Sequence, residues 1–256
     1  MIDARAVVDS RSHIDEGVHI GPFSVIGPEV QVGRGTEIGS HVVIKGPTVI
    51  GRDNRISQFA SLGDDPQDMK YAGEPTCLEI GDRNVIREFA TINRGTVQGG
   101  GITRIGNDNL FMAYIHVAHD CLIGNHVIMA NGASLGGHVS IDDYAILGGF
   151  TMVHQFCRIG VHAFCSMGTG ITKDVPPFLM VAGKPAKPHG INSEGLNRRG
   201  FSAATIQQIK HAYKTLYLRH LKLEEAVILL QKLAADSPEV GVFAEFVKSR
   251  SRSIVR

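Results

Sequence analysis

The 256-residue sequence has no tryptophan, and none of its four cysteines forms a CxxC pair. It also lacks any run of about 18 apolar residues, so no transmembrane helix is expected. The first ten residues, MIDARAVVDS, carry charge from the third position and contain no apolar signal-peptide core. Free thiols without an export signal predict a reducing, cytoplasmic setting.

An excess of charge of one sign is also missing, because 26 Lys and Arg balance 25 Asp and Glu to a formal net charge of +1. This balance argues against a general affinity for nucleic acid or membranes. It hides an asymmetry, since residues 192–256 carry eleven basic and six acidic residues, a net charge of +5. No P-loop or dinucleotide fingerprint occurs, and the G-x-S-x-G match at 132–136 lies inside a regular repeat, not at a strand-to-helix turn.

What the sequence does contain is a period of six. One apolar or thiol residue falls on every sixth position over residues 105–171, often followed by glycine, and the same period covers 2–62 and 80–92. A helix and a simple alternating strand have different periods. Three sixes make an 18-residue triangular coil, and stacked coils share one core. The pattern predicts a mainly β fold, a parallel β-helix of hexapeptide repeats over residues 1–190, with inserted loops at about 63–79 and 93–104.

Residues 191–256 predict a C-terminal α-helical domain. The sixes end in a proline-rich passage, 174–190, which we expect to be a connector. Ser202 is expected to be the N-cap of a first helix. Residues 222–235 should form a second helix, and Pro238 should begin a third that ends at about residue 248. Their apolar stripes indicate a packed helix bundle.

The 18-residue coil brings distant polar residues onto one wall. His119, Gly137 and Gln155 are each 18 residues apart, so they occupy one column with about 4.8 Å between coils. Asp120 and His138 share the next column for the same reason. The unusual polar residues of this wall are His116, His119, Asp120, His138, His154 and Gln155.

This wall predicts general-base chemistry. Histidine titrates near neutrality, and Asp120 could turn toward His119 at a corner and orient it. The backbone N–H of Gly137 could stabilise an oxyanion. With no activated Ser or Cys evident, direct transfer is favoured over a covalent intermediate. His116, His119 and Asp120 could instead ligate zinc with His138, so a zinc hydrolase on this fold remains an alternative.

Several longer runs resemble one family. The run HVAHDCLIGNHVIMANGASLGGHVSIDDYAILGG, together with DNRISQFASLGDDPQDMKYAGEPT, VHQFC, NRGTVQGGG and NSEGLNRRGFS, is similar to the cytoplasmic UDP-N-acetylglucosamine O-acyltransferases that begin lipid A biosynthesis. The similarity covers essentially the whole chain. It implies a left-handed β-helix and a homotrimer. It also implies transfer of a 3-hydroxyacyl chain from acyl carrier protein to the 3-hydroxyl of UDP-N-acetylglucosamine, with no cofactor or metal of the enzyme's own.

The resemblance also assigns roles. His119 matches the family's base, Asp120 the residue that orients it, and Gly137 the oxyanion donor. Substrate-binding positions match Asp68, Lys70, His116, His138, His154, Gln155, Asn192, Glu194 and Arg198. Of these, the 68–70 loop would reach the glucosamine, and residues 192–198 would bind uridine and diphosphate across a subunit boundary. Arginine suits diphosphate through its paired N–H donors. A basic patch with Arg199, Lys210 and Lys214 would meet the acidic carrier protein.

Two positions depart from the family pattern. Met167 stands where glycine is common at the end of the acyl groove, which predicts a chain shorter than 3-hydroxytetradecanoyl, such as 3-hydroxydecanoyl. Pro185 replaces a common histidine near the nucleotide, which puts that nucleotide contact in question. The rival functions are the N-acyltransferase of the same pathway, a coenzyme-A-dependent acetyltransferase, a zinc carbonic anhydrase and a non-catalytic scaffold. The N-acyltransferase carries an extra uridine-binding domain before its β-helix, whereas the sixes here begin at Ile2.

Overall fold

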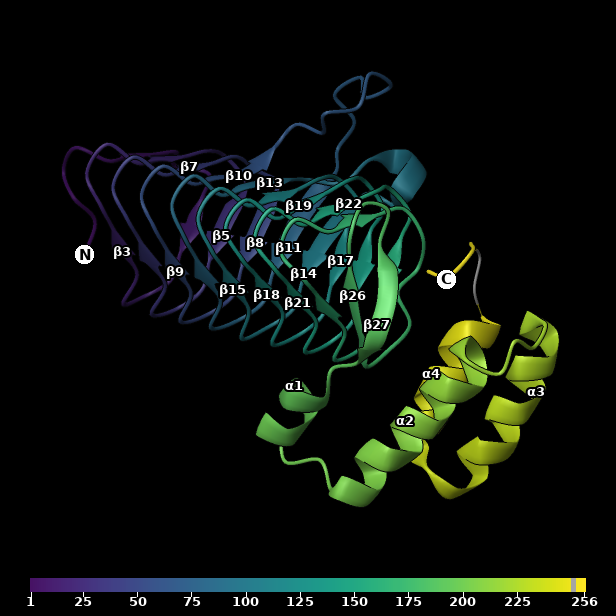
Figure 1. Ribbon diagram of the computed structural model, residues 1–256. Helices are drawn as coiled ribbons and strands as arrows, with labels where there is room; N and C mark the ends of the chain where they lie inside the picture. Colours follow the sequence, from purple (N-terminus) through teal and green to yellow (C-terminus); the bar gives the residue numbers. More distant parts are fainter. Residues whose placement is uncertain (250–251) are drawn as a thin grey trace.

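The structure is a computed structural model that describes residues 1–249 and 252–256. Short strands wind into a three-sided, left-handed parallel β-helix, and a group of helices follows it (Figure 1). The mainly β class, the handedness and the C-terminal helices are therefore confirmed. In the described residues no helix has both the length and the apolarity to cross a bilayer.

Each side of the prism is one sheet, and the three sheets are named here by their strand number. The nine-strand face contains β1 (Val7–Val8), β4 (Val25–Ile26), β7 (Val43–Ile44), β10 (Ser61–Asp64), β13 (Thr91–Asn93), β16 (His116–Val117), β19 (Ser134–Leu135), β22 (Met152–Val153) and β25 (Gly170–Ile171). The eight-strand face contains β2 (His13–Ile14), β5 (Val30–Val32), β8 (Thr48–Ile50), β11 (Cys77–Ile80), β14 (Ile102–Ile105), β17 (Leu122–Ile123), β20 (Ser140–Ile141) and β23 (Arg158–Ile159). The ten-strand face contains β3 (His19–Ile20), β6 (Glu37–Ile38), β9 (Arg55–Ile56), β12 (Val85–Ile86), β15 (Leu110–Phe111), β18 (Ile128–Met129), β21 (Ile146–Leu147), β24 (Phe164–Cys165), β26 (Leu179–Ala182) and β27 (Lys187–Ile191).

The sixth-position residues form the core, as the period predicts. From Ile105 to Ile171 none of them is more than 4 % exposed. Ile2 is 48 % exposed because no coil covers it on its outer side. Strands pair one coil apart, for example Val25 with Val43, and the two inserts only lengthen this spacing without breaking the sheet.

Corners between the faces use left-handed backbone, which costs a non-glycine residue roughly 1–2 kcal/mol. Stacking between successive coils offsets much of this cost. Phe59 stacks on Phe89 with ring centroids 5.1 Å apart, and Phe89 stacks on Tyr114 at 4.8 Å. Each such pair contributes about 0.5–1.5 kcal/mol beyond burial. The corners are therefore regular enough to hold side chains in fixed columns.

The prediction of a plain connector at 174–190 was wrong. β26 continues the ten-strand face parallel to β24, and β27 returns antiparallel to it. Phe164 pairs with Met180, so this last coil is two residues shorter than a regular 18-residue coil. The shortened coil breaks the count of six before the sheet itself ends.

The helical region contains α1 (Ser193–Arg198), α2 (Ala203–Tyr217), α3 (Leu223–Leu233), the 3-10 turn η2 (Ala234–Asp236) and α4 (Pro238–Lys248). Ser202 caps α2 by accepting the Thr205 N–H, and Pro238 is the first residue of α4, both as predicted. Helix α1 was not predicted. The inserts span residues 65–76, which project from the prism as the blue loop of Figure 1, and 94–101, which contain the 3-10 turn η1 (Val97–Gly99).

Candidate active site

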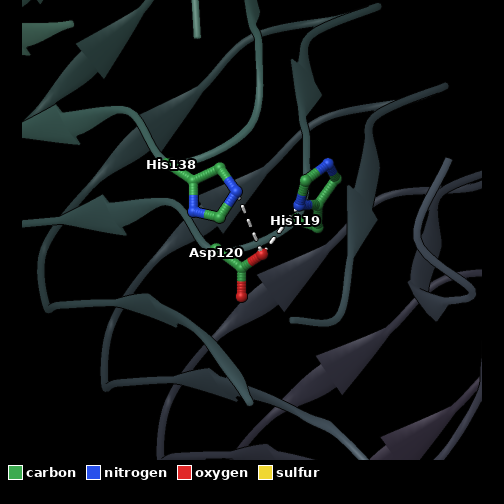
Figure 2. A group of neighbouring side chains, drawn as sticks. All are labelled: His119, Asp120 and His138. Carbon is green, nitrogen blue, oxygen red and sulfur yellow. Dashed lines mark hydrogen bonds and ion pairs between the residues drawn. The ribbon is translucent and has the colours of Figure 1, made fainter. Parts of the chain in front are cut away.

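His119 and Asp120 lie side by side at the corner between the nine-strand and eight-strand faces (Figure 2). Asp120 has φ +61°, and this left-handed turn brings its carboxylate back toward the preceding side chain. His119 Nδ1 is 2.7 Å from Asp120 Oδ2. The His119 side chain is 11 % exposed and that of Asp120 is 0 % exposed. An Nδ1–H that donates to the carboxylate leaves Nε2 of His119 as a proton acceptor.

The second insert closes over Asp120. Thr96 donates its N–H to Oδ1 at 2.8 Å and its hydroxyl to Oδ2 at 2.6 Å, while Thr103 Oγ1 accepts the Asp120 N–H at 2.8 Å. A Cβ on Gly99 would overlap the Asp120 carboxyl, so glycine allows this close approach. Sequence reasoning missed both threonines. The glycine run at 99–101 was the signal that this insert packs closely against something.

Gly137 and His138 occupy the coil above His119. A Cβ on Gly137 would lie 2.6 Å from His119 Cε1, so only glycine leaves room for the imidazole ring. In the described residues the Gly137 N–H donates to no other group. The His138 ring stands at 90° to that of His119 with centroids 5.1 Å apart, and its Nε2 is 3.7 Å from Asp120 Oδ2. Figure 2 shows both imidazoles directed at the same carboxylate oxygen.

Burial lowers the pKa of the two imidazoles that flank His119, those of His116 and His138. Burial lowers the pKa of His138, opposed by the Asp120 carboxylate and, more weakly, by Asp68. Burial and the His119 ring lower the pKa of His116, whose Nδ1 lies 2.8 Å from the Thr91 hydroxyl.

Gln155 shares the column of His119 and Gly137, and His154 precedes it in the chain. His154 is exposed, with Nδ1 3.1 Å from the Gln155 carbonyl. In the first insert the Lys70 N–H donates to Asp68 Oδ1 at 3.0 Å. The Lys70 side chain is exposed.

Residues 192–198 lie at a different corner, between the eight-strand and ten-strand faces. Asn192 caps α1 by accepting the Gly195 N–H at 3.1 Å, and it donates to the His162 carbonyl at 3.0 Å. Glu194 and Arg198 form a 4.0 Å ion pair, and their side chains are 83 % and 81 % exposed. One chain therefore does not bring these residues to His119.

Arg199 packs at this second corner. Its guanidinium lies 4.2 Å from the Tyr144 ring centroid, in a pocket that His162, Arg198 and Phe201 also line. Burial, and next the Arg199 charge, lower the pKa of His162 to about 4. Lys210 and Lys214 are exposed on α2, apart from this stack.

The two positions that depart from the family pattern both lie away from the pair of His119 and Asp120, called here the dyad. Met167 is 81 % exposed at the corner between β24 and β25. Pro185 lies in the turn between β26 and β27. Met167 thus borders the opposite edge of the nine-strand face from His119.

One group among the described residues could hold a metal ion. His119, Asp120 and His138 each offer a ligand atom, and these atoms lie within 4.8 Å of one another. Both Asp120 oxygens already accept hydrogen bonds. A metal ion would have to replace the contact between His119 and Asp120. The arrangement therefore fits an oriented base better than a zinc ligand set.

Comparisons with known proteins agree across the chain. The model of the family "Udp N-acetylglucosamine O-acyltransferase; Domain 2" matches residues 174–255, and the six-repeat bacterial transferase hexapeptide model matches 11–46 and 102–137. The acyl-[acyl-carrier-protein]–UDP-N-acetylglucosamine O-acyltransferase of Halorhodospira halophila is 55 % identical over 83 % of this chain and 82 % of its own. The crystallised UDP-N-acetylglucosamine acyltransferase of Francisella novicida has a TM-score of 0.98 and 46 % identity, covering 100 % of this chain and 94 % of its own. The enzyme of Bacteroides fragilis has a TM-score of 0.96 and 40 % identity, with both chains covered at 100 %.

Proposed function

Since the chain belongs to the acyl-[acyl-carrier-protein]–UDP-N-acetylglucosamine O-acyltransferases, we propose that it transfers a 3-hydroxyacyl chain from acyl carrier protein to the 3-hydroxyl of UDP-N-acetylglucosamine, with His119 as general base. This reaction begins lipid A biosynthesis. The observation that carries the assignment of the base is the hydrogen bond between His119 and the buried Asp120. It fixes one tautomer of the ring and leaves Nε2 available to the acceptor hydroxyl.

Each step follows from one group of the site. His119 Nε2 takes the proton of the sugar 3-hydroxyl as that oxygen attacks the thioester carbonyl carbon. The Gly137 N–H, which has no other acceptor in the described residues, donates to the oxyanion that forms. The carbon–sulfur bond then breaks, and the imidazolium returns its proton to the departing thiolate. Asp120 holds the ring throughout and stabilises its charged form.

The reaction is tested with purified protein, chelator-treated to remove divalent metals, and 3-hydroxyacyl carrier proteins of several chain lengths. Formation of an O-acylated UDP-sugar is the expected result. Activity that requires added zinc would support the alternative of a zinc enzyme on this fold. Absence of transfer at every chain length would overturn the proposed function.

We further propose that Met167 limits the acyl chain to about the length of 3-hydroxydecanoyl. The outward side chains of β16, β19 and β22, and the outward Gly170 of β25, line the nine-strand face between the His119 corner and the Met167 corner. Met152 on β22 is 51 % exposed on this face. An acyl chain that starts at the dyad and crosses this face would end at Met167, where glycine would leave more room.

Turnover of 3-hydroxydecanoyl and 3-hydroxytetradecanoyl donors, in wild type and Met167→Gly, tests this limit. Wild type should prefer the shorter chain and the variant should shift toward the longer. Met152→Ala is the matched control, because it removes another exposed methionine from the same face without changing its end. Equal preference in wild type and Met167→Gly would overturn the proposal.

The separate corners support a homotrimer in which two subunits build each site. Asn192, Glu194 and Arg198 would then bind the nucleotide beside the His119 of a neighbour, and Lys210 and Lys214 would face the acidic carrier protein. Mixing inactive His119→Ala and Arg198→Ala subunits, unfolding them and refolding them together tests this. Recovered activity would support shared sites. No recovery from subunits that do assemble into mixed trimers would contradict them.

The remaining assignments belong to the same proposal. Asp68 and Lys70 would contact the glucosamine, and His116, His138, His154 and Gln155 would line the cleft for sugar and pantetheine. The protein would act in the cytoplasm without a cofactor of its own, since the donor arrives on the phosphopantetheine of the carrier.

A further inference from the structure

The column that contains the proposed base, His119, continues to Lys173, a lysine with no role in the proposed reaction. Met152 pairs with Gly170, and Val153 with Ile171, so the coil spacing of 18 still holds at this end of the nine-strand face. Lys173 follows Ile171 as Gln155 follows Val153. It therefore stands in the column of His119, Gly137 and Gln155, three coils from the base. Its side chain is exposed and has no hydrogen bond or ion pair within the described residues.

The end of the chain returns to the same place. Asp174 and Ile254 form a parallel bridge, in which the Asp174 N–H donates to the Ser253 carbonyl at 3.0 Å and the Val255 N–H to the Asp174 carbonyl at 2.9 Å. Ile254 is 2 % exposed and Val255 is 1 % exposed, so the side chains of this tail are buried against the rest of the protein. The docking brings Arg252 to the column, where its guanidinium donates to the Gln155 carbonyl.

Together these segments line a basic groove at the end of the column. Its charged lining residues are Lys173, Lys248, Arg252 and Arg256. Lys248 is paired with Glu245 at 3.8 Å, and Arg256 donates to the Leu216 carbonyl at 3.1 Å. Asp174, next to Lys173 in the chain, is buried and accepts the Arg158 N–H at 2.9 Å. A lysine ammonium has three N–H donors and a guanidinium five, so each of these four cations keeps donors for a ligand. Lys173 and Arg252 are the two that lie at the column itself, Arg252 through its bond to the Gln155 carbonyl.

We propose that Lys173 and Arg252 bind the phosphate that joins the pantetheine arm of the acyl donor to its carrier protein. Three coils separate Lys173 from His119, a distance of about 14 Å. The extended arm has 13 bonds between phosphorus and sulfur, which at the advance of an extended chain span roughly 15 Å. A phosphate at the groove thus places the thioester at His119 and Gly137, with the arm passing Gln155. The inference rests on the proposed function and adds a subsite to it.

The test compares 3-hydroxyacyl thioesters of pantetheine and of 4′-phosphopantetheine as minimal donors. Wild type should use the phosphorylated donor with a kcat/KM about tenfold or more higher, the order of one charge-assisted hydrogen bond. Lys173→Gln should remove most of that advantage while leaving kcat/KM for the unphosphorylated donor unchanged. Lys232→Gln, an exposed lysine on α3 outside the groove, should keep the full advantage. Arg252→Gln should act like Lys173→Gln.

Lys173→Gln keeps the test valid even if Arg252→Gln releases the tail, because the lysine side chain supports no other residue. Inorganic phosphate should inhibit transfer from the phosphorylated donor and not from the other. Equal use of both donors by wild type, or an undiminished preference in Lys173→Gln, would overturn the subsite alone. Failure of wild type with both minimal donors and with the acylated carrier protein would overturn the proposed function, and the subsite with it.

Discussion

The hydroxyl of Thr96 should matter to both stability and catalysis, because it donates to the carboxylate that orients the base. Thr96→Val keeps the shape of the side chain and the N–H bond to Asp120 Oδ1. It removes the 2.6 Å bond to Oδ2 and the 3.3 Å bond that the hydroxyl accepts from the Gly99 N–H. A hydrogen bond to a charged, buried group contributes about 1.5–3 kcal/mol. The free energy of unfolding should therefore fall by about that amount.

The same loss sets an upper bound on the kinetic effect. If all of it appeared as misorientation of His119, kcat would fall by about 10- to 150-fold, at 1.36 kcal/mol per factor of ten. The assay pairs urea unfolding with steady-state kinetics, and KM for the sugar should change little. The upper bound is smaller than the largest effect expected for removing a general base, about 10⁴-fold.

Thr36→Val is the matched control, because Thr36 is equally buried and donates to the Gly51 carbonyl at 2.9 Å in a coil far from the site. It should lose stability without losing kcat beyond the fraction unfolded. If Thr96→Val behaves in the same way, with kcat intact, the reasoning that the second insert orients the dyad is refuted.

Gly99→Ala should reduce kcat more than Thr96→Val does while the circular dichroism of the β-helix stays unchanged, because its Cβ would overlap the Asp120 carboxyl; normal activity would contradict this. Tyr144→Leu removes the ring under Arg199, a contact of about 0.5–2 kcal/mol, so KM for the acylated carrier protein, the partner assigned to Arg199, should rise about 2- to 30-fold with kcat little changed. The pKa of His162 is lowered to about 4 in the folded protein from an ordinary 6.5, so the unfolded chain binds this proton first as pH falls. The unfolding free energy should therefore drop between pH 6.5 and 4, and His162→Phe should flatten that drop in urea titrations; an identical drop in the variant would contradict the assignment.

The repeat and the columns could be predicted because the six-residue period of the sequence also determines which residues pair between coils. Once the sixth positions are buried, residues 18 apart must stack, and Lys173 could have been found by adding 18 to Gln155. Thr96 could not be found in this way. It lies in an insert where the period lapses, and its contact with Asp120 depends on the path of an irregular loop.

The last coil and the tail show the same limit. Phe164 pairs with Met180 only because two residues drop out of the coil, which no count of six reveals. The docking of Ile254 on Asp174 joins segments about 80 residues apart, and the tail carries no repeat signal. The family resemblance placed residues 192–198 near a nucleotide, yet it did not reveal that Asn192 is occupied as the cap of α1.

The central claim is that His119 removes the proton of the sugar hydroxyl. Single-turnover rates of acyl transfer in wild type and His119→Ala, with both substrates saturating and across pH 5.5 to 9, test it most directly. The account predicts a loss of about 10²–10⁴-fold in the variant, together with loss of the acid limb of the wild-type pH profile. A variant within tenfold of wild type, or one that keeps the same acid limb, would show that another group takes the proton.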